Sequence, residues 1–457
     1  MAKFKFYLEA PKEDSEETVL DYDNETSELR FANGDIVVPQ SEYRDWKPFF
    51  KMDEGKRQLK TIKIQLGLKC NYSCEYCSQR FVPRNSDDTY AHQDESEKTA
   101  NEIEEFVKKF DDVDMGEEPH FEMWGGEPFL YFPKMKLVTF YLSEKFPKAT
   151  FSVITNGSLL NQEIIDFLEQ YDFSVSISHD GPGQKTRGPD PLDNPEEKKW
   201  LFKLRNILMP KGKFSVNAMI HKDNDSRADV QKWIRNNFGM VPIGEGGVID
   251  AYDEGGKSMS WKSEDEHIGY RRKAFKEIMN KKIEQFTMLE GKIQNFIDSL
   301  KEQRPSTSLL QKCGMDMPST ISTDLNGKIT TCQNVTTSSN NPAGISHEIG
   351  TLENLEEVNI KTGTHWSDRV ECPKCPVLHL CQGSCLFLSP NSEEWELSCE
   401  NSYSDNVVWL SAALYEITGQ VLYKIEGPHP EHRKDIFGFE KDEYIQKAQE
   451  RETITTN

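Results

Sequence analysis

The stretch Cys70-Asn-Tyr-Ser-Cys74-Glu-Tyr-Cys77 decides how this chain is expected to fold, because of what stands on either side of it. The residues directly before it, Thr61-Ile-Lys-Ile-Gln-Leu-Gly67, read as a strand. After it, strand-like and helix-like segments alternate, which predicts a parallel sheet with crossover helices. The three cysteines therefore follow the first strand, in the loop where a barrel of parallel strands carries its catalytic groups.

About six strand–helix units make up this region, which predicts an open or partial barrel. The predicted strands are 61–67, 120–124, 150–155, 173–178, 214–220 and 246–251, and the predicted helices are 96–110, 134–146, 162–171, 196–208 and 227–237. Ahead of the barrel we expect short strands at 4–8, 18–22 and 28–39, with a tight turn at Asn33-Gly34.

The composition of the chain changes after the barrel. Residues 263–303 are charged and helical, and the sequence beyond Pro305 is loop-rich and dense in cysteine. We expect four parts: a strand-rich segment 1–58, the barrel with a helical bridge 59–304, a metal-organised domain 305–400, and a tail 401–457 that begins with a helix over 407–425.

The composition narrows the possible partners of the protein. The 457 residues include 55 Lys and Arg against 77 Asp and Glu, a net charge of −22. Nucleic-acid binding is disfavoured, because neutralising phosphates needs a surplus of positive charge. No apolar run approaches the roughly 20 residues that cross a bilayer, and the first residues lack the apolar centre of a secretory signal. These features predict a cytoplasmic protein without nucleic-acid or membrane partners.

The ten cysteines form two groups, three in the first loop and seven in the last third of the chain. In a reducing cytoplasm, clustered cysteines are more often metal ligands than disulfides. Structural zinc sites are the simplest alternative for the seven. For the first group zinc is a poorer account, because three cysteines in eight residues leave its fourth tetrahedral position without an obvious local ligand.

The first group has the spacing CxxxCxxC, with the aromatic Tyr76 before the third cysteine, and in this it resembles the radical S-adenosylmethionine (SAM) enzymes. The resemblance implies that Cys70, Cys74 and Cys77 hold a four-iron cluster with one iron left for SAM. Electron transfer into SAM would release methionine and a 5′-deoxyadenosyl radical, which takes a hydrogen atom from the substrate.

Three further motifs follow consecutive predicted strands in the order that this family has them. Trp124-Gly125-Gly126-Glu127-Pro128 matches the family's GGEP motif, and Thr155-Asn156-Gly157 and Ser178-His179-Asp180-Gly181 close the next two strands. Glycines let a backbone approach a ligand closely, although turns and helix caps use the same residue types. The resemblance implies SAM contacts from Tyr76, Gly125, Gly126, Glu127, Pro128, Asn156, Ser178 and Asp180.

The spacing of the seven later cysteines resembles the SPASM domain, the auxiliary-cluster domain of peptide-modifying radical SAM enzymes. The resemblance implies an outer cluster on Cys372, Cys375, Cys381 and Cys399 and an inner cluster on Cys313, Cys332 and Cys385. Two auxiliary four-iron clusters need eight thiolates for full cysteine ligation, and this segment offers seven. The missing inner ligand could be a substrate group, water, or a side chain such as Asp316.

Several features bear on the reaction itself. No cysteine remains to return a hydrogen atom to a substrate radical, which favours oxidation or cross-linking over epimerisation. The residues before Cys70 read as strands, which disfavours a complete winged-helix leader-binding domain. Asp250 and Asp253, after the sixth strand, are candidate general bases, although a solvated acidic loop is the simpler interpretation. We interpret His179 and His221 as hydrogen-bonded loop residues.

These features together predict an oxidoreductase with a partial (β/α)6 TIM-type barrel of the radical SAM type and a SPASM domain, carrying SAM and three four-iron clusters in all. It would install a thioether or carbon–carbon cross-link in a ribosomally made precursor peptide, with flavodoxin or ferredoxin as electron donor. The alternative within the family is an anaerobic sulfatase-maturating enzyme, which forms formylglycine from Cys or Ser but usually has another cysteine between the positions of Cys313 and Cys332. The alternative from another class is a zinc- or iron–sulfur-organised binding or electron-carrier protein.

Overall fold

A nine-stranded mixed sheet dominates the computed structural model, which describes residues 2–9, 17–49, 57–80, 98–283, 287–340, 344–358, 364–385 and 388–438. The strand order is β12-β11-β10-β4-β5-β6-β7-β8-β9. Six consecutive parallel strands form its main part: β4 (Leu59–Gln65), β5 (Met115–Trp124), β6 (Thr150–Thr155), β7 (Ser174–Ser178), β8 (Phe214–Ile220) and β9 (Ile243–Val248). The predicted α/β fold is therefore present.

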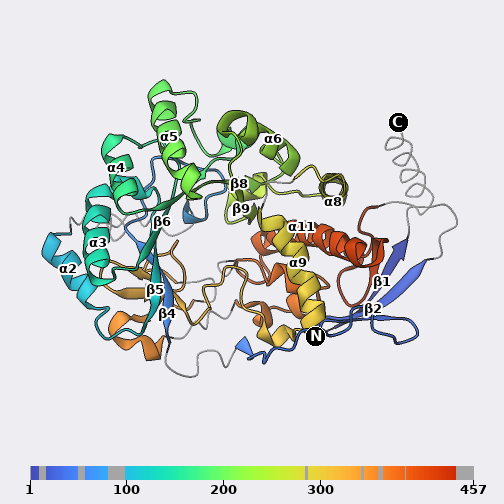
Figure 1. Ribbon diagram of the computed structural model, residues 1–457. Coiled ribbons are helices and arrows are strands. Elements are labelled where there is room, and N and C mark those ends of the chain that lie inside the picture. Colours follow the sequence, from blue (N-terminus) through green and yellow to red (C-terminus); the bar gives the residue numbers. More distant parts are fainter. Residues whose placement is uncertain are drawn as a thin grey trace.

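Helices between these strands cover one face of the sheet (Figure 1). They are α2 (Ala100–Lys108), α3 (Phe132–Lys145), α4 (Gln162–Gln170), α5 (Pro195–Leu208) and α6 (Arg227–Phe238). Side-chain caps set several of their starts: Thr99 forms a capping box on α2, and Asn161 and Ser226 cap α4 and α6. Local sequence signals were therefore sufficient to place these helices. The first two residues of the predicted helix 96–110 lie outside the described residues.

The two faces of the parallel strands differ in chemistry. Ile62, Ile64 and Phe121 are completely buried in the main hydrophobic core. Between these positions, Lys63 Nζ lies 3.6 Å from a Glu122 carboxylate oxygen, and both side chains are partly exposed. Because successive side chains of a strand point to opposite faces, the inner face of this open barrel is polar and partly accessible.

The sixth predicted strand is displaced by three residues. Its pairing with β8 ends at Ile220 opposite Val248. The next apolar residues, Ile249 and Ala251, are buried outside the sheet, and the Ala251 N–H donates to Ser398 Oγ at 2.7 Å. These residues are apolar because they pack against a later part of the chain. In the sequence, this apolar character is indistinguishable from that of a buried strand.

Three strands after Pro305 extend the barrel sheet. They are β10 (Thr320–Asp324), β11 (Lys328–Thr330) and β12 (Glu348–Thr351). β10 pairs in parallel with β4, from Thr320 opposite Thr61 to Asp324 opposite Gln65, whereas β11 and β12 are antiparallel. The pairing crosses the predicted boundary at 304/305 and brings the start of the cysteine-rich region to the edge of the barrel.

A second sheet has the order β13-β1-β2-β3. It combines β1 (Lys3–Glu9), β2 (Thr18–Asp23) and β3 (Glu28–Phe31) with β13 (Val421–Glu426). The predicted strand 28–39 ends early, because the chain turns at Asn33-Gly34, where Gly34 has a φ of +91°, and Ile36 bridges back to Arg30. The N-terminal strands were thus predicted in type, but their partner β13 was not.

The predicted helix over 407–425 is wrong at both ends. The helix α11 spans Glu393–Thr418, and residues 421–426 form β13 instead. Ser392 caps its start and acidic residues occupy its first turn, where the helix dipole favours them, whereas Gly419 ends it with a φ of +71°. β13 then pairs with β1, so a strand far away in sequence decides its conformation.

Figure 1 shows α9 and α11 between the barrel and this second sheet. Further helices of the described residues are α7 (Glu254–Ser258), α8 (Glu264–Met279), α9 (Thr287–Glu302) and the short α10 (Leu378–Cys381). α8 and α9, which occupy the predicted helical bridge, pack against α11. No helix in the described segments combines the length and apolar character needed to cross a bilayer.

Buried charges link these helices. Arg227 on α6 lies 2.7 Å from the carboxylate of Asp405 on α11, and Lys292 on α9 lies 3.0 Å from the other oxygen. The Tyr270 hydroxyl on α8 also donates to this carboxylate at 2.7 Å. Four helices from different parts of the chain therefore meet at one carboxylate.

Candidate functional site

The first cysteine loop lies directly after β4, at the carboxyl end of the parallel strands. Burial raises the pKa of the Cys74 thiol to about 11; the nearby Arg187 opposes this rise, and the Cys77 and Cys70 thiols add to it. Cys70 is exposed, and the other two are partly exposed. The three thiols thus share one accessible site, and binding to a metal would deprotonate them.

The GGEP motif holds this loop in place. The Gly126 N–H donates to the Gly67 carbonyl at 3.1 Å, and the Glu127 N–H donates to the Lys69 carbonyl at 2.9 Å. A Cβ at Gly125 would lie 2.7 Å from Gly67 O, and one at Gly126 would overlap the carbonyl oxygens just before Cys70. The glycines are therefore required by a close approach to the cysteine loop itself.

Glu127 joins the ends of two strands. Its carboxylate is buried and accepts three hydrogen bonds from the chain, from the N–H groups of Phe129 (3.1 Å) and Asn156 (2.9 Å) and from Thr155 Oγ1 (2.8 Å). Burial raises the pKa of Glu127, and these donors oppose the rise. A contact from Glu127 to the SAM amino group remains a prediction beside this positioning role.

The remaining predicted SAM contacts lie around the same loop. The Asn156 amide donates to Asn71 Oδ1 at 2.8 Å, which ties the third strand end to the residue after Cys70. Ser178 ends β7 with its side chain partly exposed. Pro128 begins the short 3-10 helix η3 (Pro128–Tyr131). The structure therefore brings the predicted residues together at one end of the sheet.

Arg187 is a residue of this site that the sequence analysis missed. Its Nη1 donates to the Tyr76 hydroxyl at 2.8 Å and lies 3.2 Å from Asp180 Oδ1. Tyr76 donates to the other Asp180 oxygen, and Asp180 also accepts the Met219 N–H at 2.9 Å. The guanidinium places a positive charge beside the cysteine loop, and only the folded chain reveals this position.

The two strand-end histidines are held by loop contacts, in agreement with their interpretation from the sequence. His179 is completely buried; its Nδ1 accepts the Gly181 N–H at 3.0 Å and its Nε2 lies 3.1 Å from Asp190. His221 is also buried and accepts the Asp223 N–H at 3.3 Å.

The two candidate bases have different positions. Asp253 caps α7 by accepting the Gly256 N–H at 3.0 Å, so its carboxylate is used to start a helix. Asp250 instead accepts hydrogen bonds from Ser384 and, at 3.3 Å, from the Tyr252 hydroxyl. Asp250 therefore lies beside the cysteine-rich region, next to the residue that precedes Cys385.

Lys312 lies near Asp250 and was also missed from the sequence. Its Nζ is 3.7 Å from where a Cβ on Gly247, at the end of β9, would lie. Burial alone would lower the pKa of Lys312, but the Asp250 carboxylate and the Cys381 and Cys385 thiols raise it. A protonated amine therefore faces the last barrel strand and the later cysteines together.

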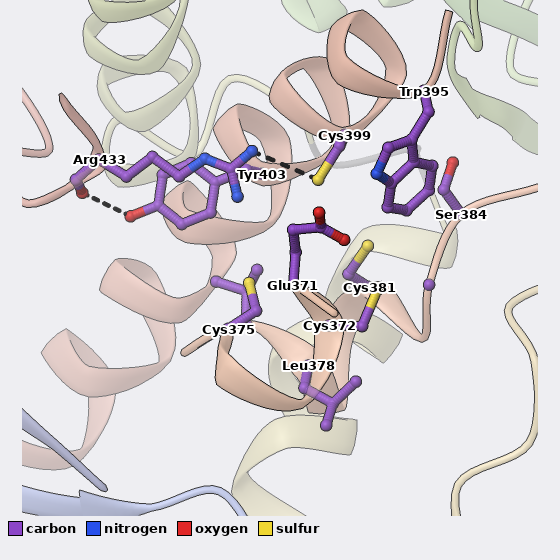
Figure 2. A pocket seen from close by; sticks show the side chains of 12 residues that line it. Glu371, Cys372, Cys375, Leu378, Cys381, Ser384, Trp395, Cys399, Tyr403 and Arg433 are labelled. Atoms are coloured by element: carbon purple, nitrogen blue, oxygen red, sulfur yellow. Dashed lines mark hydrogen bonds between the residues drawn. The ribbon is translucent and has the colours of Figure 1, made fainter. Parts of the chain in front are cut away.

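Four of the later cysteines line one cavity (Figure 2). They come from three elements: η9 (Cys372–Lys374) and the residue after it, the end of α10, and α11. The four thiols are Cys372, Cys375, Cys381 and Cys399. They are the set that the spacing assigned to the outer cluster.

The number of these thiols matches the four thiolates that a fully cysteine-ligated four-iron cluster takes. Four is also the ligand number of a structural zinc ion.

The other three cysteines meet at the barrel mouth. Cys332 and Cys385 pack with Tyr252 against Val335. Burial raises the pKa of Cys332 to about 12, and the nearby Cys313 thiol raises it further. Burial also raises the pKa of Cys313, and the Asp316 carboxylate adds to this rise. We refer to Cys313, Cys332 and Cys385 as the inner thiols.

The segment after Cys332 is attached to the barrel. The Trp124 indole N–H donates to Asn334 Oδ1 at 2.8 Å, and Gln79, two residues after Cys77, donates to the same oxygen at 3.2 Å. Gln65 donates to the Val335 carbonyl at 2.8 Å. The segment that carries Cys332 is thereby attached to the end of the barrel sheet that precedes the first cysteine loop.

Residues 64–234 match the model of the radical SAM superfamily. This chain contains a radical SAM domain. A radical SAM domain implies SAM and a four-iron cluster as cofactors, and the three thiols of the first loop are suited to hold that cluster.

A curated protein of Paramaledivibacter caminithermalis, named radical SAM cyclopropyl synthase TigE, is similar to this chain. The two are 26% identical over 202 residues, which are 42% of this chain and 41% of that protein. The similarity therefore spans less than half the length of the relative.

Solved structures extend the likeness of the radical SAM domain to most of the fold. Native anSMEcpe with bound AdoMet and the Cp18Cys peptide has a TM-score of 0.53 at 17% identity, covering 79% of this chain and 98% of that chain. Streptococcus suis SuiB bound to S-adenosylmethionine has a TM-score of 0.43 at 14% identity, covering 74% of this chain and 77% of that chain. The anSMEcpe match shows a shared fold.

Gly126→Ala is expected to reduce SAM cleavage in this radical SAM domain severely. Its Cβ would overlap backbone atoms, so the cysteine loop must shift, and overpacking of this kind costs about 1–3 kcal/mol. The measurements are 5′-deoxyadenosine formation and the free energy of unfolding. Gly269→Ala is the matched control, because a Cβ there meets nothing within 4 Å inside α8. Full cleavage activity in Gly126→Ala would contradict the positioning role of the motif.

Two buried arginines lie near the four thiols of Cys372, Cys375, Cys381 and Cys399, which we call the outer thiols; the cavity that they line is the outer cavity. Arg433 Nη2 lies 3.3 Å from Cys399 Sγ (Figure 2). It also lies 2.6 Å from a Glu400 carboxylate oxygen. Arg369 is 2% exposed, stacks over Trp395 at 3.7 Å and donates to the Cys385 carbonyl at 3.1 Å. Buried positive charge therefore stands on both sides of the outer cavity.

If Cys372, Cys375, Cys381 and Cys399 hold the four-iron cluster that their spacing implies, Arg433→Gln is expected to lower the reduction potential of that cluster. Reduction adds negative charge, which a nearby cation stabilises, and hydrogen bonds to cluster thiolates act in the same direction. Arg433→Lys should restore part of the shift. The measurement is a redox titration followed by EPR, with Lys434→Gln, which removes a more exposed cation, as control. An unchanged midpoint in Arg433→Gln would show that this arginine does not influence the cluster.

Proposed function

We propose that the protein is a peptide maturase, which abstracts a hydrogen atom from a ribosomally synthesised precursor peptide and leaves a thioether or carbon–carbon bond. The observation that carries this proposal is the position of the inner thiols at the mouth of an open polar barrel, with the segment that carries Cys332 attached to the end of the sheet that precedes the first cysteine loop. A substrate between the inner thiols and that loop would contact both. The peptide bound in the anSMEcpe structure supports a peptide as the substrate class.

The chain's own residues define the SAM site. Cys70, Cys74 and Cys77 would hold the four-iron cluster, which would supply the electron that cleaves SAM to a 5′-deoxyadenosyl radical. The Arg187 guanidinium suits the SAM carboxylate, since such pairs form strong hydrogen bonds. The Ser178 hydroxyl, partly exposed at the end of β7, suits the ribose.

Two auxiliary four-iron clusters complete the proposal. The outer thiols form a full set of four ligands around one cavity, as such a cluster requires. The inner thiols supply three more ligands. Flavodoxin or ferredoxin would supply the electron that cleaves SAM, and an auxiliary cluster would take up the second electron when the substrate radical is oxidised.

Asp250 is the proposed proton acceptor, whereas the carboxylate of Asp253 is engaged as the N-cap of α7. Ser384 and Tyr252 hold the Asp250 carboxylate between β9 and the inner thiols. From this position it can accept a proton when a substrate carbon is oxidised.

Carbon–carbon bond formation is the favoured outcome. All ten cysteines belong to the three thiol groups, so none remains as a hydrogen donor to a substrate radical. The relative's name, cyclopropyl synthase, also denotes formation of a carbon–carbon bond. The second candidate is formylglycine formation from Cys or Ser, which uses the same combination of barrel and cysteine-rich region.

The deciding experiment is mass spectrometry of the peptide encoded beside this gene, after anaerobic incubation with enzyme, SAM and reductant. Loss of two hydrogens with fragmentation blocked between two residues identifies a cross-link. The same loss confined to one residue identifies a ring within a side chain. An unchanged peptide, with an aldehyde formed on a sulfatase-derived peptide, would establish the second candidate instead.

A further inference from the structure

The inner thiols are one ligand short of a complete set. Four-iron clusters with full cysteine ligation use four thiolates, and the other seven cysteines of the chain belong to the first loop and the outer cavity. A fourth ligand from the chain must therefore be an oxygen or nitrogen atom near the inner thiols.

Asp316 shares a short loop with Cys313. Its Oδ2 accepts the Gln311 N–H at 2.8 Å, which closes residues 311–316 into a compact turn. The Gln311 side chain donates to the Ser384 carbonyl at 2.7 Å and accepts the Trp366 N–H at 3.2 Å. One glutamine thus ties this loop to the segment of the third inner thiol, Cys385.

His365 faces the same carboxylate oxygen. The Ser367 N–H donates to its Nδ1 at 3.2 Å, so the ring proton of the neutral form resides on Nε2. Nε2 lies 3.5 Å from Asp316 Oδ2. The ring is stacked on Phe49 at 4.5 Å between centroids. Oδ2 therefore accepts one hydrogen bond, from Gln311, and has the His365 ring beside it, whose Nε2 makes no hydrogen bond to the residues that the structure describes.

The other oxygen of the Asp316 carboxylate, Oδ1, differs from Oδ2 in its hydrogen bonding. Asp316 Oδ1 is buried and has no hydrogen-bond partner among the residues that the structure describes, although the whole side chain is 12% exposed. A buried carboxylate oxygen without a partner costs free energy. Asp250, the other carboxylate in this region, has both oxygens hydrogen-bonded. Asp316 is thus the acid here that retains an oxygen for a metal.

We propose that Asp316 Oδ1 is the fourth protein ligand of the inner auxiliary cluster, together with Cys313, Cys332 and Cys385. The inference rests on the inner cluster of the proposed function, and it makes the inner site a closed one, with three thiolates and one oxygen.

The test first removes the SAM-binding cluster, because its open iron would bind the same probe. Cys70, Cys74 and Cys77 are replaced by alanine in the full-length chain, and the protein is reconstituted with iron and sulfide under anaerobic conditions. Iron analysis should give about eight iron per chain. About four would mean that only one auxiliary cluster forms, and would overturn the ligand proposal together with the two-cluster part of the proposed function.

Cyanide labelled with carbon-13 is the probe for an accessible iron, and its coupling to the reduced clusters is measured by pulsed EPR. Asp316→Ala should bind cyanide at least about tenfold more tightly than the chain with Asp316, a difference of about 1.4 kcal/mol. Asp316→Cys should bind it no more tightly than the chain with Asp316. Asp368→Asn, an exposed acid of the same segment, is the matched control and should leave binding unchanged.

Equal cyanide affinity with and without the Asp316 carboxylate, at about eight iron per chain, would overturn the proposal while leaving the proposed function intact. If Asp316→Ala does not fold, the Asp316→Asn variant serves in its place, because the amide retains the shape but is a poorer ligand. Its cyanide affinity should then also exceed that of the unsubstituted residue.

Discussion

Cys74→Ala is expected to abolish SAM cleavage while the two auxiliary clusters of the proposed function remain. The variant removes one of three thiolates from the first loop, and the other thiol groups lie on separate elements after residue 305. Formation of 5′-deoxyadenosine should fall to background. Iron should fall from about 12 to about eight per chain after anaerobic reconstitution.

The matched control for this variant is Cys399→Ala. It removes one thiolate of the outer cavity at the same cost in side-chain volume, and should lower the iron content while SAM cleavage continues. Persistent cleavage in Cys74→Ala would show that the first loop does not hold the SAM-binding cluster. Almost no iron, with zinc in its place, would support the alternative of a zinc-organised binding protein without radical chemistry.

Asp405→Asn is expected to destabilise the fold by about 3–5 kcal/mol, because breaking a buried ion pair leaves an uncompensated charge. Arg227 and Lys292 both pair with this carboxylate, and Arg227 is only 2% exposed. The measurement is the free energy of unfolding in denaturant. Asp298→Asn, on the more exposed face of α9, should change it by no more than about 0.5 kcal/mol.

The buried Asp405 carboxylate and its two cations also predict how the stability of the fold depends on pH. Burial alone would raise the pKa of Asp405, but the Arg227 and Lys292 cations lower it well below its usual range. The unfolded chain has the ordinary value of about 3.9. The stabilisation is therefore complete above about pH 4 and is lost as the pH falls toward the lower, folded pKa. A stability difference between the parent and Asp405→Asn that did not shrink in acid would contradict this assignment.

The barrel could be predicted from the sequence because the patterns that specify its strands and helices are local. Strand 150–155 and strand 214–220 were predicted with the bounds that the structure has, and helix caps such as Asn161 lie within a few residues of the elements they start. The cysteine spacing and the GGEP motif are equally local. Together they identified the radical SAM domain and the groups of thiols.

The tail and the edges of the sheets could not be placed in this way. Residues 421–426 continue the apolar pattern of α11, yet they form a strand because β1 offers a pairing partner more than 400 residues earlier. The strand β10 likewise joins β4 across the predicted domain boundary. Such pairings depend on which segments meet in space, which no short window of sequence contains.

The sequence by itself determined the order of the barrel elements, the radical SAM motifs and the number of available thiols. Only the tertiary structure distinguished the two candidate bases: Asp250 lies beside the cysteine-rich region, whereas Asp253 caps a helix. It also brought Arg187 and Lys312 to these groups of thiols. The physical reason is that a charge acts over a few ångströms of space, and the contacts that set those distances join residues far apart along the chain.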